Sequence, residues 1–209
     1  MLFVWCKVSF DEKRSHGSAV CETVYFFVEF VCVFPWKCVS LNNQNRGKIM
    51  DGILRKLPIG IQTFEKLREG DYLYVDKTAL VWRIASTETP YFLSRPRRFG
   101  KSLLLSTFEA YFEGKKELFE GLAIADMEKE WKTYPVLHLD LNAEKYDSPQ
   151  ALVEILSRQL TQWELKYGKG EDEETLSGRF AGVIRRASEQ SGRGVVVLVD
   201  EYDKPLLQA

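Results

Sequence analysis

The stretch that decides the fold is Pro90-Tyr91-Phe92-Leu93-Ser94-Arg95-Pro96-Arg97-Arg98-Phe99-Gly100-Lys101-Ser102. Its first five residues predict a short strand, and an apolar-faced helix is expected at residues 102–112. Gly-Lys-Ser between a strand and a helix is an arrangement that wraps phosphate groups, because backbone N–H groups and the positive end of the helix dipole face the anion. We therefore expect this loop to bind phosphate.

The residue types in the loop have distinct expected roles. Gly100 lets the backbone approach the anion closely, and Lys101 reaches the β- and γ-phosphates of a bound nucleotide. The Ser102 hydroxyl is an expected ligand of Mg²⁺. The full set of expected ATP contacts is Arg97, Arg98, Phe99, Gly100, Lys101 and Ser102.

The loop departs from the usual G-x-x-x-x-G-K-[ST] pattern, because Arg95 occupies the position of the first glycine. Together with Arg97 and Arg98 it forms a basic cluster that could contact a nucleic acid backbone. No aromatic ladder or basic stripe extends this cluster, and the formal net charge of the chain is -1. Phosphate binding is the leading interpretation, and nucleic acid binding through the arginines is an alternative.

A second group of candidate residues follows an apolar strand expected at residues 194–199. Asp200 and Glu201 come directly after it, at the carboxyl edge of a parallel sheet, where ligands bind in open α/β folds. We expect Asp200 to hold Mg²⁺, mainly through water, and Glu201 to act catalytically by polarising an attacking water molecule. Asp140 also ends a strand, but we expect it to brace the local backbone, and we expect His138 to be a core residue.

From Met50 onward, strands and helices alternate. Strands are expected at residues 90–94, 136–141 and 194–199, and helices at 77–85, 102–112, 116–119, 127–131, 149–167 and 176–189. Asp76 is placed to cap the first of these helices. Apolar strands separated by helices predict an α/β fold with a mostly parallel sheet flanked by helices.

Residues 1–49 differ in character from residues 50–209. All four cysteines lie in the first 38 residues, and the polar run at 41–48 is typical of a linker. The apolar run at 24–36 is interrupted by Glu29 and Pro35, and is shorter than the roughly 20 residues that a membrane-spanning helix needs. We expect a leader and linker outside the core, and no membrane association. The cysteine-free remainder favours a reducing cytoplasm.

Residues 56–209 resemble a bacterial family of predicted AAA-ATPase-like proteins. Five blocks carry the resemblance in order: Leu57-Pro58-Ile59-Gly60-Ile61, Tyr74-Val75-Asp76-Lys77-Thr78, Tyr91 to Ser102 of the loop above, Pro135-Val136-Leu137-His138-Leu139-Asp140 and Val199-Asp200-Glu201-Tyr202-Asp203-Lys204-Pro205. Arginine in place of the first glycine is also found in that family. The resemblance implies a P-loop ATPase fold, with Lys101 and Ser102 in the Walker A loop and Asp200-Glu201 as the Walker B pair.

The resemblance also implies a reaction and partners. ATP and Mg²⁺ are the implied cofactors, and ATP hydrolysis is the implied reaction of a complete member. A C-terminal PD-(D/E)XK nuclease-like domain is common in the family, so contact with nucleic acid is implied only beyond Ala209. A protein partner or self-association is compatible with the family.

We expect this chain to be an N-terminal fragment, incomplete at the C-terminus, that binds ATP and hydrolyses little of it. In AAA-like sheets a later strand lies between the phosphate-loop strand and the strand that ends in Asp-Glu. We expect residues 91–94 and 195–199 to lack that shared neighbour. A non-hydrolysing, nucleotide-dependent interaction module is the alternative from another class.

Overall fold

The structure is a computed structural model that describes residues 2–8, 55–87, 90–94, 99–142, 146, 148–171 and 173–205. The chain divides into two compact units, one formed by Met1–Asp11 with Lys56–Ala209 and the other by Glu12–Arg55. Apart from Arg55, the described residues belong to the first unit. The fold below is the fold of that unit.

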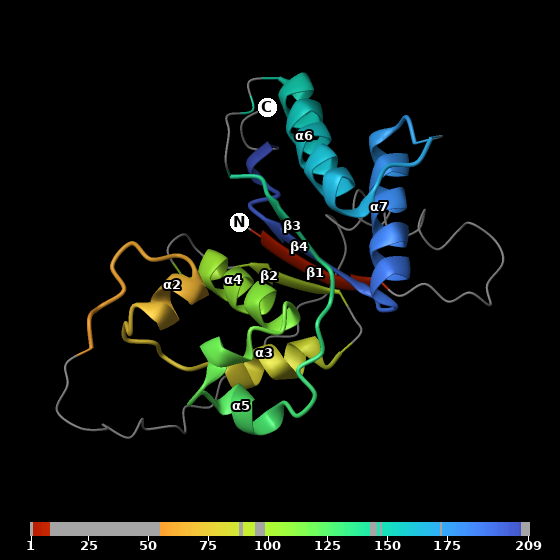
Figure 1. Cartoon of the computed structure of the whole chain (residues 1–209). Helices are drawn as coiled ribbons and strands as arrows, with labels where there is room; N and C mark the ends of the chain where they lie inside the picture. The colour runs from red at the N-terminus through yellow and green to blue at the C-terminus, as the bar shows by residue number, and fades with distance from the viewer. Residues whose placement is uncertain are drawn as a thin grey trace. The chain divides into compact units, whose positions relative to one another are not determined.

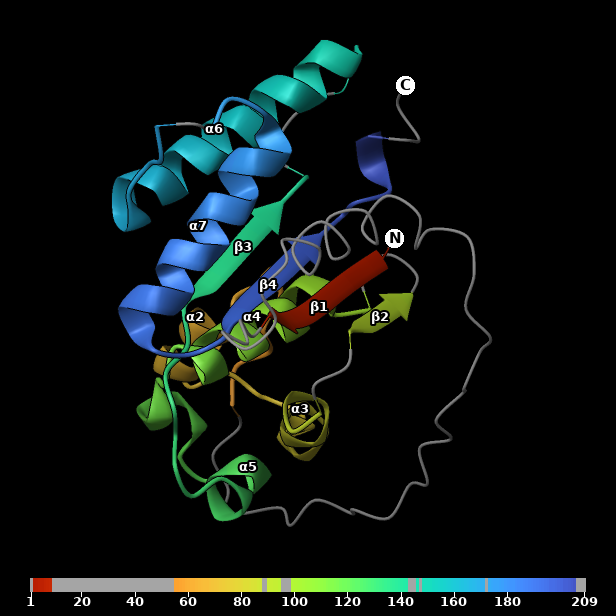
Figure 2. The same ribbon diagram turned by 90° about the vertical axis from the view of Figure 1, so that its right-hand side faces the viewer.

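A four-stranded sheet in the order β2-β1-β4-β3 forms its centre (Figure 2). The strands are β1 (Leu2–Val8), β2 (Tyr91–Ser94), β3 (Val136–Asp140) and β4 (Val195–Asp200). β3 and β4 are parallel, whereas β1 runs antiparallel to both β2 and β4. Strands β2, β3 and β4 therefore point in one direction, and β1 alone is reversed.

Strand β1 corrects two predictions from the sequence. Residues 1–49 are predicted to lie outside the core, but Leu2–Val8 occupies the position between β2 and β4. The strands predicted to lack a shared neighbour have this one, since Val4 pairs with Phe92 on one side and Val199 on the other. The physical reason is that facing strands carry backbone N–H and C=O groups that need partners. The reversed strand also makes the sheet less parallel than predicted. Residues 9–49 lie outside the described residues.

Helices cover both faces of the sheet (Figures 1 and 2). Alternate residues of β4 point to opposite faces, as in any strand: Val196 and Leu198 pack with one group of helices, whereas Val195, Val197 and Val199 pack with the other. The first group comprises α2 (Phe64–Glu69), α3 (Thr78–Ala85), α4 (Lys101–Phe112), the 3₁₀ helix η1 (Lys116–Phe119) and α5 (Ala123–Met127). The second comprises α6 (Pro149–Tyr167) and α7 (Leu176–Ser191). The α/β class expected from the sequence is confirmed.

Most predicted helices are present, with one displacement and one addition. The N-cap residue of α3 is Lys77 and not the predicted Asp76, but Asp76 Oδ1 accepts a hydrogen bond from the Thr78 backbone N–H at 2.8 Å and so braces the start of the helix. The helix predicted at 127–131 lies earlier, because α5 ends at Met127 and Trp131 has a positive φ of 45°. Helix α2 is an addition of only six residues.

No helix among the described residues combines the length and apolar character needed to span a membrane. The apolar run at 24–36 lies outside the described residues.

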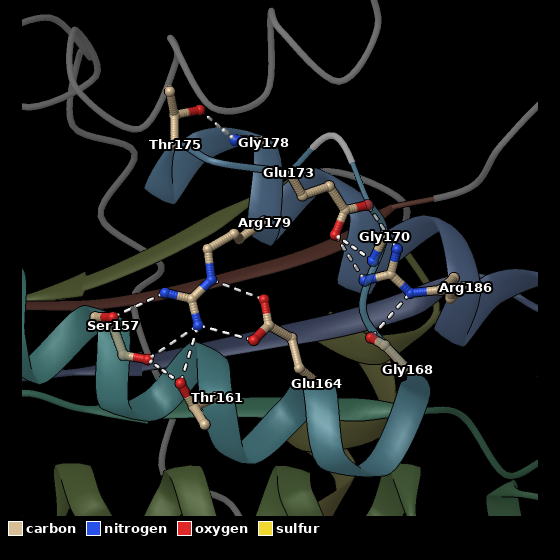
Figure 3. A network of polar contacts seen from close by, with 10 residues as sticks. All are labelled: Ser157, Thr161, Glu164, Gly168, Gly170, Glu173, Thr175, Gly178, Arg179 and Arg186. Atoms are coloured by element: carbon tan, nitrogen blue, oxygen red, sulfur yellow. Dashed lines mark hydrogen bonds and ion pairs between the residues drawn. The ribbon is translucent and has the colours of Figure 1, made fainter.

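Two arginine–glutamate pairs join α6, α7 and the loop between them (Figure 3). Arg179 on α7 donates to both carboxylate oxygens of Glu164 on α6, at 2.7 and 2.8 Å. Arg186 donates to both oxygens of Glu173 in the connecting loop, at 2.5 and 2.9 Å. The bonds from the arginines lower the pKa of Glu164 and of Glu173. Bidentate, largely buried pairs of this kind fix one relative geometry of the two helices.

Candidate functional site

The start of α4 is built around a glycine in the left-handed conformation. Gly100 is the N-cap of α4, with φ 72° and ψ 28°, a conformation that other residues adopt only with strain. Lys101 follows as the first helical residue and is buried. The first backbone N–H groups of an α-helix have no acceptor within the helix. At the start of α4 these groups point out of the N-terminal end of the helix. A helix start of this kind can accept an anion.

Ser102 connects this helix start to the end of β4. Its Oγ donates a hydrogen bond to Asp200 Oδ2 at 2.8 Å. Asp200 is the last residue of β4 and is buried. A hydroxyl from the start of α4 and a carboxylate from a distant strand thus lie in hydrogen-bond contact, and the role of both as Mg²⁺ ligands stays a prediction.

The second carboxylate oxygen of Asp200 bears on whether a cation fits beside Ser102. Asp200 Oδ1 is buried and has no hydrogen-bond partner among the described residues. Leaving such an oxygen unsatisfied is costly, so it indicates a ligand such as a cation or an ordered water molecule. Mg²⁺ at nucleotide sites typically takes one or two carboxylates, waters and substrate phosphates. The Ser102 and Asp200 oxygens fit that requirement.

A dedicated protein cage for a metal is not found in the described part of the chain, where no group of three or more His, Cys, Asp or Glu side chains converges.

Glu201 combines a buried side chain with a strained backbone. It is buried and has a positive φ of 57°, which is strained for a residue with a side chain. Burial raises the pKa of its carboxyl group, the negative charge of Asp200 raises it further, and the positive charge of Lys101 acts in the opposite direction. Lys101, Asp200 and Glu201 are therefore close enough to influence one another electrostatically.

Contacts that sequence reasoning missed hold the acidic strand end in place. The ring of Phe92 on β2 lies 5.8 Å, centroid to centroid, from the ring of Tyr202. Lys204 Nζ donates to the backbone carbonyl of Asn142, just after β3, at 2.5 Å. Burial raises the pKa of the Tyr202 hydroxyl to about 12. The only signal for these contacts was the block Val199 to Pro205, which continues past the Asp-Glu pair.

Asp140 and His138 on β3 were also assigned roles from the sequence. Asp140 Oδ1 accepts a hydrogen bond from the Asn142 N–H at 2.8 Å, which confirms the predicted backbone brace. His138 was predicted to be a core residue, but its ring is only half-buried. Its Nδ1 lies 3.0 Å from Glu109 Oε2 on α4. Burial lowers the pKa of His138, but the hydrogen bond and charge of Glu109 outweigh it, and the net shift is upward.

The predicted site residues differ in how far the structure describes them. Gly100, Lys101, Ser102, Asp200 and Glu201 come from two distant segments and gather at the end of β4. Phe99 precedes Gly100 and is exposed. Arg97 and Arg98, like Arg95, lie outside the described residues, so their roles stay predictions.

A hollow of about 550 Å³ lies away from these residues, beside α6 and the loop before α7. Its lining includes Glu164, Glu173 and Arg179. The glutamates are already paired with arginines in the network of Figure 3, so their charges neutralise one another and we assign the hollow no ligand.

Comparison with known proteins places the chain in a family. The model of the predicted AAA-ATPase family matches residues 58–209, so the chain belongs to this family. An uncharacterized protein in the vnfD 5' region of Azotobacter chroococcum mcd 1 is 46% identical over 154 residues, which cover 73% of this chain and 30% of that relative. The chain thus spans less than a third of the relative's length. No solved structure matches it.

Proposed function

We propose that this chain binds ATP with Mg²⁺ at the start of α4, and that it is the ATP-binding part of a cytoplasmic ATPase. The observation that carries the proposal is the 2.8 Å bond between Ser102 Oγ and Asp200 Oδ2. It joins a Gly-Lys-Ser helix start to an acidic strand end, the two parts that phosphoryl-transfer sites combine. Membership of a family described as predicted ATPases supports it.

Each residue of the site has a proposed task. Lys101 and the first N–H groups of α4 bind the phosphates, with Gly100 allowing close approach. Ser102 and Asp200 hold Mg²⁺, which when bound neutralises phosphate charge. Arg97, Arg98 and Phe99 complete the proposed nucleotide contacts.

Glu201 is the proposed catalytic residue, which orients and polarises the attacking water. Burial and the charge of Asp200 raise the pKa of its carboxyl group, which is the direction in which active sites tune a carboxylate that accepts a proton. Catalysis of this kind depends on placement, and small displacements cost about 100-fold in rate.

Calorimetric titration with ATP in the presence of Mg²⁺ tests the proposal. Lys101→Ala removes the buried charge at the phosphates, and a charged hydrogen bond contributes about 1.5–3 kcal/mol, so we expect affinity to fall roughly tenfold or more. Lys169→Ala is the matched control, because Lys169 lines the hollow beside α6 and should leave ATP affinity unchanged. Equal ATP affinity in wild type and Lys101→Ala would overturn the proposal.

A further inference from the structure

Glu109 on α4 and His138 on β3 form a pair that has no task in the proposed mechanism. His138 Nδ1 lies 3.0 Å from Glu109 Oε2, and both side chains are half-buried. The hydrogen bond from His138 lowers the pKa of Glu109. Burial lowers the pKa of His138, but the hydrogen bond and charge of Glu109 outweigh it, and the net shift is upward. Both shifts favour the charged forms, so the two residues form an ion pair while the imidazole is protonated.

This pair lies on the same side of α4 as the contact between Ser102 and Asp200. Glu109 follows Ser102 by seven residues, or two turns, which places both on one side of the helix about 10 Å apart. On the sheet, Asp140 pairs in register with Asp200, and His138 shares a face with Asp140 because alternate residues of a strand do. Helix α4 therefore has one polar contact to β4 at its start and another to β3 two turns later.

The two contacts restrict α4 more than its apolar packing does. Leu105 and Phe108 of this helix are fully buried, but apolar burial is non-directional and tolerates small rotations of a helix about its axis. Hydrogen bonds depend on direction as well as distance. A helix held by two of them, two turns apart on one side, has its rotation and its shift along the axis fixed together.

We propose that His138 and Glu109 are positioning residues for the phosphate site: they hold α4 in the rotation that brings Ser102 to Asp200 and directs Lys101 at the phosphates of a bound nucleotide. The proposed function is the basis for this role. Neither residue touches the nucleotide, and both act through α4.

The free ring nitrogen of His138 makes the positioning dependent on pH. Nε2 is buried and has no hydrogen-bond partner among the described residues. The charged groups that act on the ring are Glu109 from α4, Asp200 from β4 and Asp140 from its own strand, and Lys115 acts on Glu109. All three carboxylates favour the protonated ring. Because the pKa of His138 is raised, the contribution of the ion pair is complete below the ordinary histidine pKa and is lost as the pH rises through the raised value.

NMR titration of the imidazole tests the pair without any ligand. The chain has two histidines, so the signal that disappears in His138→Gln is identified directly. We expect the pKa of His138 to be lower in Glu109→Gln than in wild type, and unchanged in Glu117→Gln. Glu117 is the matched control because it is an exposed residue of η1, just after α4, and loses the same charge. An equal pKa of His138 in wild type and Glu109→Gln would overturn the ion pair.

Calorimetric titration with ATP and Mg²⁺ at pH 6 and pH 8.5 tests the link to the phosphate site. Comparison of variants at one pH cancels the protonation of ATP itself. At pH 6 we expect Glu109→Gln and His138→Gln to bind ATP about three- to fivefold more weakly than wild type, since a neutral hydrogen bond replaces a charged one. At pH 8.5 the difference should shrink, because wild type then also has a neutral pair. Glu117→Gln should bind as wild type does at both values.

The outcomes separate this role from the function on which it rests. If Glu109→Gln binds ATP as wild type does, or loses the same affinity at both pH values, the pair is merely structural and the positioning role is wrong, while the phosphate site stands. If wild type binds no ATP at either pH, the proposed function fails and the positioning role fails with it. Melting temperatures show whether each variant is folded. Should Glu109→Gln not fold, His138→Gln decides the matter, because its amide can still donate a neutral hydrogen bond to Glu109.

Discussion

Ser102 and Asp200 are 98 positions apart in the sequence, yet Ser102 Oγ and Asp200 Oδ2 lie within 2.8 Å of each other. This bond uses one of the two carboxylate oxygens, and the other is buried without a partner among the described residues. The serine hydroxyl keeps its lone pairs while it donates to Asp200. Oxygen donors from both sides of the site are therefore available to one cation.

The first prediction concerns Mg²⁺. Asp200→Asn removes the negative charge but keeps the size of the side chain, so we expect ATP affinity in Mg²⁺ to fall about tenfold, toward the value measured in EDTA. Asp140→Asn is the matched control, because Asp140 pairs in register with Asp200 but its carboxylate braces Asn142. Titration calorimetry with and without EDTA measures both. An equal loss in the two variants would contradict a specific role for Asp200.

The second prediction concerns Glu201 and pH. Its pKa is raised in the folded state, so the stability it contributes is present below the ordinary carboxyl pKa and is lost as the pH rises through the raised value. We expect Glu201→Gln to unfold at a higher temperature than wild type at pH 8, and the difference to shrink as the pH approaches 4. Glu171→Gln, an exposed control, should show no such trend. The same Glu201→Gln variant should lose any phosphate release that wild type has.

The third prediction concerns the pairs between α6 and α7. Arg179→Ala leaves Glu164, whose side chain is 6% exposed, without its buried partner, and this should cost about 3–5 kcal/mol. Arg185 makes one 3.4 Å contact to Glu173 and its side chain is 54% exposed, so Arg185→Ala should cost less than about 1 kcal/mol. Urea unfolding measures the free energy of unfolding of both variants. Similar losses in the two would contradict a larger stabilising role for the Arg179–Glu164 pair.

The same pairs predict a response to acid. The lowered pKa of Glu164 and of Glu173 means that their contribution to stability is present above the ordinary carboxyl pKa and is lost as the pH falls through the lowered values. Wild type should therefore lose stability in that range. Arg179→Ala should lose less over the same interval, because its Glu164 no longer has a depressed pKa.

The fourth prediction concerns the boundary near residue 49. We expect limited proteolysis to cut at residues 42–48, in the polar run, and to leave residues 50–209 compact. Because β1 pairs with two strands of the sheet, the released N-terminal piece should stay bound to the core after cleavage and separate only on denaturation. Size-exclusion chromatography followed by mass spectrometry shows this directly. A piece that separates at once would mean that β1 adds little to the sheet.

The candidate site was within reach of sequence reasoning because its signals are local. Gly100-Lys101-Ser102 follows a strand and opens a helix, Asp200-Glu201 ends an apolar strand, and parallel strands bring such ends to one edge of the sheet. The left-handed backbone of Glu201 has no such signal, because it depends on how the chain packs after β4. Arg97 and Arg98 remain predictions.

The fold was harder to predict from the sequence where contacting residues are far apart in the chain or where a helix or strand is short. Helix α6 matches its predicted range, since a long amphipathic pattern and a proline at its start mark it. Helix α2 has six residues, too few for a periodic pattern, and its first N–H is satisfied by Ser106 from another helix. No local feature of Leu2–Val8 indicates which strands it pairs with. Its Trp5 pairs with Tyr91 and with Leu198, which are both distant in the sequence.

The place of β1 in the sheet has a consequence for how quickly this unit can fold. Strand β1 pairs with both β2 and β4. Its pairing with β4 brings together Val4 and Val199, which are almost 200 residues apart in the sequence. Closing so long a loop loses chain entropy before any contact compensates, and folding rates fall as contacting residues become more distant in sequence. On a ribosome, the helices α2 to α5 can form early, whereas the middle of the sheet has to wait for residues 195–200 to emerge. Folding of this unit should therefore be slow, with its central strand among the last to be placed.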